Sequence, residues 1–282
     1  MPRPERSDCI MMVLESCMLF VFLPEVAAGV NGPLFHKLGK AAGHKDVVVV
    51  DVFRQGGDLV GKLACTGNGT RIADADAHGI DKRIAALTKG GDTSRTSITL
   101  KGLRIDAHAG KLLGIAQADA KLGRMSKPVL LTPSVFLQQD SANRCYSKAF
   151  TVEQGLKEDG ELKVRAVYNF TGSGVNEATV PTEKLKCDAL DALLALIKEA
   201  GEAMGDQLEM WKADIDSAFR RLPVKAAHRD LAWVAWRVDE KRMAIARHFA
   251  MPFGAIASVH YWDRVGSRFV CYLFSLCAGV CE

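Results

Sequence analysis

Two apolar runs separated by a very short polar connection constrain the fold of this chain more than any other part of its sequence. The first run is "LAWVAWRV" (Leu231 to Val238) and the second is "RMAIARHFA" (Arg242 to Ala250), with only "DEK" between them. Parallel strands need a crossover of about a dozen residues or more, so a connection this short joins antiparallel neighbours. The sequence therefore predicts a β-hairpin over these residues.

Helices and strands are predicted in a mixed order around this hairpin. "ELKVRAVYNF" (161–170) predicts a strand, and 188–204 predicts a helix because its leucines recur at helical spacing. "QLEMWKADIDSAF" (207–219) predicts another strand, and a final helix is expected from Ser258, which could cap it. The order strand, helix, strand, hairpin, loop, helix is typical of an α+β fold.

The first part of the chain contains fewer signals. We expect an apolar and poorly ordered N-terminal segment over 1–45 and an unassigned α/β region over 46–128. Within that region "DVVVVDVF" (46–53) predicts a buried strand and "TSITLKGLRID" (96–106) a second strand. "GNGT" (67–70) lacks the spacing of a phosphate-binding loop and is interpreted as a turn.

The stretch "KADIDSAFRRLPV" (212–224) places two carboxylates inside an otherwise apolar segment that ends in arginines. A buried carboxylate is costly unless a partner compensates it. On a strand, residues i and i+2 point to the same side, so Asp214 and Asp216 could share a cation. The alternative is an acid at the end of a strand that simply faces solvent.

Three segments, taken together and in order, resemble a known family. They are "ELKVRAVYNFTGSGVNEAT", "ADIDSAFRRLPV" and "MPFGAIASVHYWDRV". This series is similar to the fingers segment, the first carboxylate motif and the loop-plus-helix motif of retrotransposon-type reverse transcriptases, which are RNA-directed DNA polymerases. The resemblance implies a partial reverse-transcriptase fold with an antiparallel sheet packed on helices. Its fingers-like region would be 129–210 and its incomplete palm 211–282.

The activity that this resemblance implies is template-directed nucleotidyl transfer with two Mg²⁺ ions. Mg²⁺ prefers hard oxygen ligands and shares them with substrate phosphates. By the resemblance, Asp214 is the catalytic residue and supplies a carboxylate, and the main-chain carbonyl of Ile215 supplies another oxygen. The implied partners are an RNA or DNA primer-template and deoxynucleoside triphosphates.

The same resemblance assigns nucleotide contacts before and after the carboxylate. Asp216, Ser217 and Ala218 would form the turn beneath the triphosphate, with backbone N–H groups that suit an anion. Phe219 occupies the position of an aromatic steric gate that excludes a 2′-hydroxyl; alternatively it is a core residue at a strand-to-helix corner. Arg165 would contact the triphosphate, or else it is a surface arginine on a strand.

The loop before the last helix would complete the pocket. Phe253 and Gly254 align with residues that pack on the new base pair, and glycine permits close approach of the backbone to a substrate. Ser258 is either a helix cap or a substrate contact. Four basic side chains could touch template phosphates, although such residues are also common as solvated surface charge. They are Arg220, Arg221, Lys225 and Arg229.

The chain departs from the family in its second carboxylate motif. No Tyr-x-Asp-Asp is present, and no Asp follows Asp263. The fingers strand carries "VYNF" where related segments tend to have acidic residues. A single carboxylate lacks most of the anionic ligand charge that two Mg²⁺ ions need. We therefore expect a truncated copy with little or no polymerase activity by itself.

Composition adds weak constraints on location and partners. The net charge of +4 is compatible with nucleic-acid binding but does not establish it. The 8 cysteines are scattered without zinc-ligand spacing, which predicts reduced, mostly buried thiols and an intracellular location, in the cytoplasm or the nucleus. The apolar run 9–30 is interrupted by Glu15, Pro24 and Glu25, so it falls short of the ~20 clean apolar residues of a membrane span, and no membrane association is expected.

Three hypotheses follow from the sequence. The first is a reverse-transcriptase-like fragment of a mobile element, and the second is a non-catalytic nucleic-acid-binding protein derived from a polymerase fold. The third is an unrelated α+β protein with accidental motif matches. The first requires Arg165, Asp214 and Gly254 to lie around one cleft, and the third predicts that they lie far apart.

Overall fold

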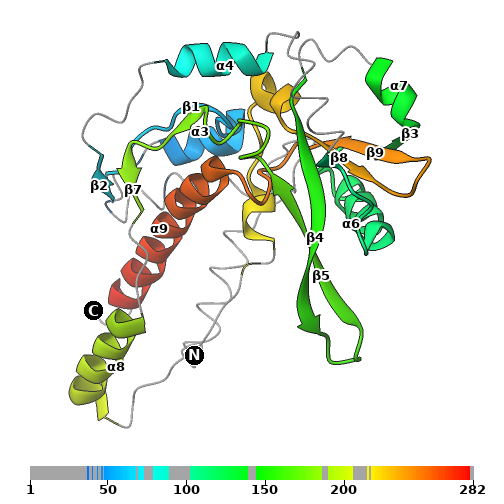
Figure 1. Cartoon of the computed structure of the whole chain (residues 1–282). Coiled ribbons are helices and arrows are strands. Elements are labelled where there is room, and N and C mark those ends of the chain that lie inside the picture. The colour runs from blue at the N-terminus through cyan, green and yellow to red at the C-terminus, as the bar shows by residue number, and fades with distance from the viewer. Residues whose placement is uncertain are drawn as a thin grey trace.

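The computed structural model describes residues 48–67, 69–72, 79–88, 102–138, 144–185, 190–205 and 217–279, and the single residues 37, 40, 43, 46 and 215. These residues form a mixed α/β architecture in which helices surround one larger sheet (Figure 1). The sheet includes antiparallel pairs, as the α+β prediction requires.

The main sheet has the strand order β3-β9-β8-β4-β5. Its strands are β3 (Val129–Leu131), β4 (Tyr146–Leu156), β5 (Leu162–Asn169), β8 (Trp233–Arg237) and β9 (Met243–Arg247). All neighbouring strands are antiparallel except β4 and β8, which are parallel. The predicted hairpin is confirmed as β8–β9, with Trp233 opposite Arg247, and the predicted strand over 161–170 is confirmed as β5.

Helices and short strands complete the described part of the chain. The helices are α3 (Val48–Gln55), α4 (Ile80–Thr88), α6 (Ala109–Lys121), α7 (Pro133–Gln138), α8 (Leu190–Met204) and α9 (Ile256–Gly279), with 3₁₀ turns η2 (Ala218–Arg221) and η3 (Ala226–Leu231). Two small sheets pair β1 (Gly61–Lys62) with β6 (Thr179–Val180) and β2 (Thr70–Arg71) with β7 (Glu183–Lys184). Helix α6 packs on β4 and β5, and α9 packs on α3 and η2.

The prediction of a strand over 46–53 is wrong, because this segment contributes helix α3. Its valines favour strands only weakly, and packing overrides such a preference. Val49, Val52 and Phe53 recur at helical spacing and are buried. The Asp46 carboxylate also accepts a hydrogen bond from the N–H of Val48 at 3.0 Å, which satisfies one of the open donors at the start of the helix.

Other sequence predictions are confirmed in part. The described end of the predicted strand over 96–106 is not a strand: Gly102 is helical, and Ile105 forms an isolated bridge with Arg237. Most of the predicted strand over 207–219 lies outside the described residues, and Ala218 and Phe219 belong to a 3₁₀ turn. The last helix is confirmed, but it begins at Ile256, before Ser258.

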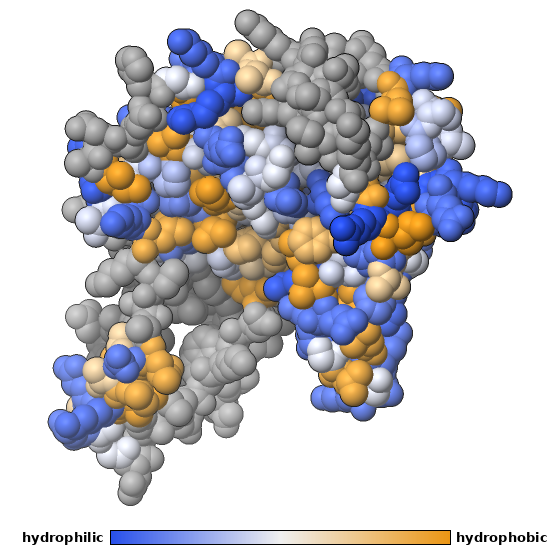
Figure 2. All heavy atoms as spheres, viewed as in Figure 1, coloured by the Kyte–Doolittle hydropathy of each residue, from blue (hydrophilic) through white to orange (hydrophobic). Residues whose placement is uncertain are grey.

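The helix predicted over 188–204 is confirmed as α8, but its leucines do not face a core within the described structure. Leu190 is 68 % exposed, and Leu193, Leu194 and Leu196 are also exposed. Figure 2 shows this apolar surface on α8. Among the described helices, none combines the length and the apolar character needed to cross a membrane.

One hydrophobic core connects most of the described elements. Its buried residues come from α3, α6, β4, β5, β8, β9 and α9, so the region 46–128 packs into the same core as the elements that follow it in the chain. Trp236, 1 % exposed, and Phe170, fully buried, are among its largest members. A smaller cluster under the outer face of the sheet contains Phe136, Tyr146 and Met243.

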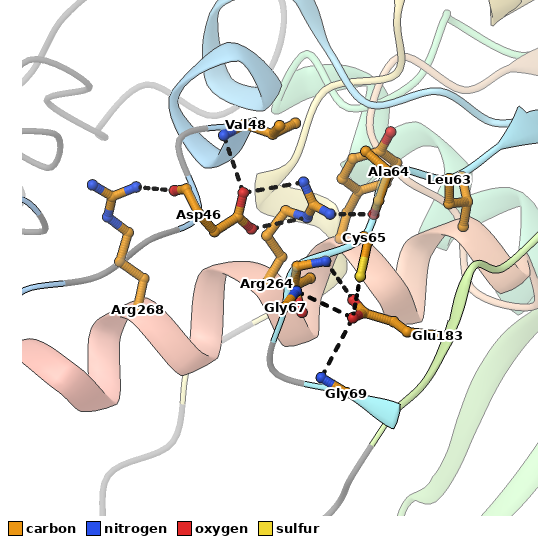
Figure 3. A network of polar contacts seen from close by, with 12 residues as sticks. Asp46, Val48, Leu63, Ala64, Cys65, Gly67, Gly69, Glu183, Arg264 and Arg268 are labelled. Carbon is orange, nitrogen blue, oxygen red and sulfur yellow. Dashed lines mark hydrogen bonds and ion pairs between the residues drawn. The ribbon is translucent and has the colours of Figure 1, made fainter. Parts of the chain in front are cut away.

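Two buried acidic residues tie the N-terminal region to the rest of the chain (Figure 3). Asp46 forms an ion pair with Arg264 of α9 at 3.2 Å, and its backbone carbonyl accepts a hydrogen bond from Arg268 at 2.7 Å. Glu183 of β7 accepts hydrogen bonds from the backbone of the glycine-rich loop, at 2.6 Å from Thr66 and 3.2 Å from Gly67. The loop that was interpreted as a turn therefore binds a carboxylate of the chain itself.

Candidate functional site

Three segments that are far apart in the sequence meet around two phenylalanine rings. Arg165 projects from β5, Phe253 lies in the loop before α9, and Phe219 lies in η2. The guanidinium carbon of Arg165 is 4.7 Å from the centroid of the Phe253 ring. The Phe253 and Phe219 rings are 5.4 Å apart and tilted. We call Arg165, Phe219 and Phe253 the Arg–Phe cluster.

One side of the Arg–Phe cluster rests on the core and the other faces outward. Phe219 and Phe253 are partly buried and pack against the main core, and Trp262 of α9 lies 6.4 Å from Phe219 in an edge-on arrangement. Arg165 is exposed. A guanidinium over a ring is attracted to the ring face, and it carries its N–H donors in its own plane. The cluster therefore presents hydrogen-bond donors beside an aromatic surface.

Gly254 allows the loop before α9 to press directly on the end of β5. Its φ of +91° is in the left-handed region, which favours glycine. A Cβ at this position would meet the backbone oxygen of Tyr168 at 2.2 Å. This close approach positions Phe253, the preceding residue, within reach of Arg165 on the same strand.

Asn176 holds the same loop through two hydrogen bonds. Its Nδ2 donates to the carbonyl of Gly254 at 2.9 Å, and its Oδ1 accepts from the N–H of Ile256 at 3.0 Å. Because Ile256 is the first residue of α9, Asn176 acts as a cap supplied from a distant segment. Asn176 and Trp262 were not among the predicted site residues, although Asn176 is the asparagine that follows the turn in the quoted fingers segment.

Replacing Gly254 by Ala is expected to destabilise the chain by about 2–3 kcal/mol, because strain at positive φ adds to the collision with the Tyr168 carbonyl. The measurement is urea-induced unfolding. Gly160→Ala is the matched control: its φ is +77°, but nothing lies within 4 Å of an added Cβ. Equal losses in the two variants would contradict the role of the close approach.

The turn that follows the two predicted carboxylates in the sequence is strained. Asp214 and Asp216 lie outside the described residues, so the structure gives no position for the predicted catalytic carboxylate. Ile215 is 40 % exposed. Ser217 has a φ of +54° and a ψ of +40°, and it is the one non-glycine residue with positive φ in the described part of the chain. Such strain is often found at functional sites. Ala218 follows it as the first residue of η2.

Arg220 lies in the interior rather than on a surface that could meet template phosphates. Its side chain is 3 % exposed, and it forms an ion pair with Asp119 at 2.6 Å. It also donates to Nδ1 of His248 at 2.7 Å. Burial and the charge of Arg220 hold the pKa of His248 well below its usual value, so the neutral ring can accept this hydrogen bond. We therefore exclude Arg220 from the proposed nucleic-acid contacts.

The other three predicted phosphate contacts are partly exposed. Lys225 forms an ion pair with Asp58 at 2.9 Å. The guanidinium of Arg229 lies 5.3 Å from the centroid of the Phe249 ring. Arg221 is partly buried. Lys225 and Arg229 therefore already have partners within the chain, and a phosphate would compete with them.

Ser258 is neither an N-cap nor an exposed contact. It is fully buried within the first turn of α9, and its hydroxyl donates to the carbonyl of Pro252 at 2.6 Å. This hydrogen bond holds the bend that precedes Phe253.

The described residues do not by themselves fit a magnesium site. No group of three or more His, Cys, Asp and Glu side chains is placed to hold a metal within the part of the chain that the structure describes. The Arg–Phe cluster contributes a cation and aromatic rings, whereas Mg²⁺ requires oxygen ligands. The predicted metal ligands are Asp214, which lies outside the described residues, and the carbonyl of Ile215.

No protein-family model and no curated protein matches the chain.

Proposed function

We propose that the chain is a fragment of a reverse-transcriptase-like polymerase from a mobile element and that the Arg–Phe cluster is part of its nucleotide-binding pocket. The observation that carries the proposal is the contact of Arg165 with Phe253 and of Phe253 with Phe219. These residues come from the three segments on which the resemblance rests. An unrelated fold with accidental matches gives no reason for all three to meet.

The chemistry of the Arg–Phe cluster suits a nucleoside triphosphate. The guanidinium of Arg165 lies over the Phe253 ring, and its planar fork of N–H donors could bind a phosphate. Phe219 packs against Phe253 with the ring centroids 5.4 Å apart, and its ring would pack beneath a deoxyribose. The bend at Gly254 brings backbone close to the position of the base pair. Asp216, Ser217 and Ala218 would form the turn beneath the triphosphate.

Magnesium belongs to this proposal through Asp214 and the Ile215 carbonyl. When bound, two Mg²⁺ ions would neutralise the charge of the triphosphate and the departing pyrophosphate. The 282 residues contain no second carboxylate motif of the Tyr-x-Asp-Asp type. We therefore propose that nucleotidyl transfer belongs to the parent enzyme and that this chain alone binds nucleotide and primer-template without extending the primer.

Replacing Arg165 by Gln is expected to weaken binding of a fluorescent deoxyadenosine triphosphate analogue roughly tenfold to a hundredfold, the effect of losing charge-assisted hydrogen bonds. Fluorescence anisotropy of the analogue measures the affinity. The matched control is Lys163→Gln, which removes a charge from an exposed neighbour on the same strand.

The variant Asp214→Asn tests the proposed metal ligand, and it should remove the dependence of nucleotide affinity on magnesium concentration.

Two results would contradict the nucleotide pocket. One is an affinity of the wild-type chain for the analogue no higher than that of the unfolded chain. The other is an equal loss of affinity in Arg165→Gln and Lys163→Gln, since a general charge effect would then explain both.

A second candidate function is non-catalytic binding of nucleic acid. It is favoured by the composition of the described site, which combines a cation with aromatic rings and includes no carboxylate ligand among the described residues. Salt-dependent binding to a primer-template duplex that is unchanged in Asp214→Ala and independent of nucleotide would favour this alternative.

A further inference from the structure

His228 joins the segment that follows α3 to the 3₁₀ turn η3. Its Nδ1 atom accepts a hydrogen bond from the backbone N–H of Leu59 at 3.0 Å. A backbone N–H is always a donor, so Nδ1 must present a lone pair, and the neutral ring carries its proton on Nε2. This contact therefore requires the uncharged imidazole. We call the hydrogen bond between Leu59 and His228 the histidine clasp.

Leu59 connects the histidine clasp to a third element. Its side chain is fully buried in the main core. Its carbonyl accepts a hydrogen bond from the hydroxyl of Thr179 in β6 at 2.9 Å. The backbone of Leu59 thus links η3 to β6, and loss of the clasp would break this link at the η3 end.

Two charged groups of the described chain act on the imidazole of His228. The carboxylate of Asp58 lies 3.6 Å from Nδ1, and the ammonium of Lys225, at the start of η3, lies 2.9 Å from the same carboxylate oxygen. The hydroxyl of Tyr261 in α9 donates to the other carboxylate oxygen at 3.4 Å. Burial raises the pKa of Tyr261 to about 12, so this hydroxyl stays protonated in neutral and mildly acidic solution.

We propose that the histidine clasp is a pH-sensitive switch, which is closed when His228 is neutral and opens when His228 binds a proton. Protonation places an N–H on Nδ1 opposite the N–H of Leu59, and two donors cannot share a hydrogen bond. The charged ring would turn instead to the Asp58 carboxylate, in competition with Lys225. The side chain of His228 is 20 % exposed, so a proton can reach it from solvent. The clasp shares no residue with the Arg–Phe cluster, so this inference goes beyond the proposed nucleotide pocket.

The direction of the pH dependence follows from the surroundings of the ring. Burial lowers the pKa of His228, and this effect, together with the charge of Lys225, outweighs the raising effect of Asp58. A histidine with a lowered folded-state pKa contributes its stability above the unfolded value of about 6.5, and loses it as the pH falls through the folded value. The clasp should therefore be closed at neutral pH and should open progressively in mild acid.

Hydrogen exchange of the Leu59 amide, measured by NMR and divided by the intrinsic exchange rate, reports on the clasp directly. Its protection should fall about fivefold between about pH 7.5 and about pH 4.5, the factor that corresponds to loss of one ordinary hydrogen bond. The Leu63 amide is an internal control, because it donates to the carbonyl of Val180 at 2.9 Å. Its protection should stay constant over the same range.

Three substitutions separate a switch from a purely structural contact. His228→Asn keeps an acceptor near the position of Nδ1 but does not titrate in this range, so Leu59 should stay protected at every pH measured. Asp58→Asn removes the charge that favours the protonated ring and should move the opening to lower pH. Lys225→Gln removes the opposing charge and should move it to higher pH. His108→Gln, at the start of α6, is the matched control and should keep the wild-type pH dependence.

Three outcomes would overturn the inference. They are constant protection of Leu59 in the wild-type chain, a pH dependence that persists in His228→Asn, and an equal loss of protection at Leu59 and Leu63. The tautomer provides an independent check, because the nitrogen chemical shifts of the His228 ring should place its proton on Nε2 at neutral pH. A proton on Nδ1 would exclude the histidine clasp.

Discussion

Replacing Asp46 by Asn is expected to lower the free energy of unfolding by about 3–5 kcal/mol, the usual cost of leaving a buried charge without its partner. Asp46 and Arg264 have side chains that are 2 % and 3 % exposed, and Arg268 is buried beside them. Asn keeps the size of the side chain and an acceptor for the N–H of Val48. It removes the negative charge that offsets the arginines.

Urea-induced unfolding measures this loss, and Asp51→Asn is the matched control. Asp51 lies on the exposed face of α3, the helix that Asp46 caps, so the same chemical change there should cost little. An Asp46→Asn variant as stable as Asp51→Asn would show that the ion pair is not maintained in solution. Asp46→Asn should also loosen α3 from α9, which hydrogen exchange at the α3 amides would detect.

The stability of the chain is expected to fall in acid as the pH drops from about 4.5 toward 2, because of Glu183. Burial by itself raises the pKa of this carboxyl, but hydrogen bonds from Cys65, Thr66 and Gly67 outweigh burial and lower the pKa to about 2. A carboxyl with a lowered folded-state pKa contributes its stability above its unfolded pKa and loses it as the pH falls through the folded value. The contribution at neutral pH is roughly 3 kcal/mol.

Unfolding free energies measured in urea across this pH range test the prediction. Glu183→Gln should be less stable at neutral pH and should show a flatter pH dependence than wild type. Glu177→Gln, at an exposed position in the preceding turn, should retain the wild-type pH dependence.

The pKa of Asp263 offers a second check. Burial and the charge of Glu183 raise this pKa, so it should fall in Glu183→Gln. A wild-type slope in Glu183→Gln would contradict the assignment.

The local pattern of the sequence predicted the elements that depend on near neighbours. The β8–β9 hairpin follows from two strand-like runs joined by a short connection, and α8 follows from leucines at helical spacing. Helix α3 was predicted as a strand because β-branched valines favour strands in general. Its helical state depends on Asp46 at its start and on α9 beside it, and neither contact is visible in the local pattern.

The resemblance to polymerases selected residues that do come together. Arg165, Phe219 and Phe253 were chosen from separate segments and form one cluster. Asn176 and Trp262 complete their surroundings. The place of Asn176 after the turn of the fingers segment was a signal for it, whereas Trp262 has no feature that separates it from the other Trp residues in the sequence. Their roles arise from distances across the fold, such as the 3.0 Å from the Asn176 Oδ1 to the N–H of Ile256.

The sequence alone determined that this chain contains a hairpin followed by a Pro-Phe-Gly bend and a helix, because turn chemistry and residue spacing act over a few neighbouring positions. Only the tertiary structure decided what each arginine does. Arg165 lies exposed over a ring, Arg220 is buried against Asp119, and Arg264 is buried against Asp46. All three side chains carry the same charge and donors, and their roles differ because segments distant in the sequence supply their partners and exclude the water around them.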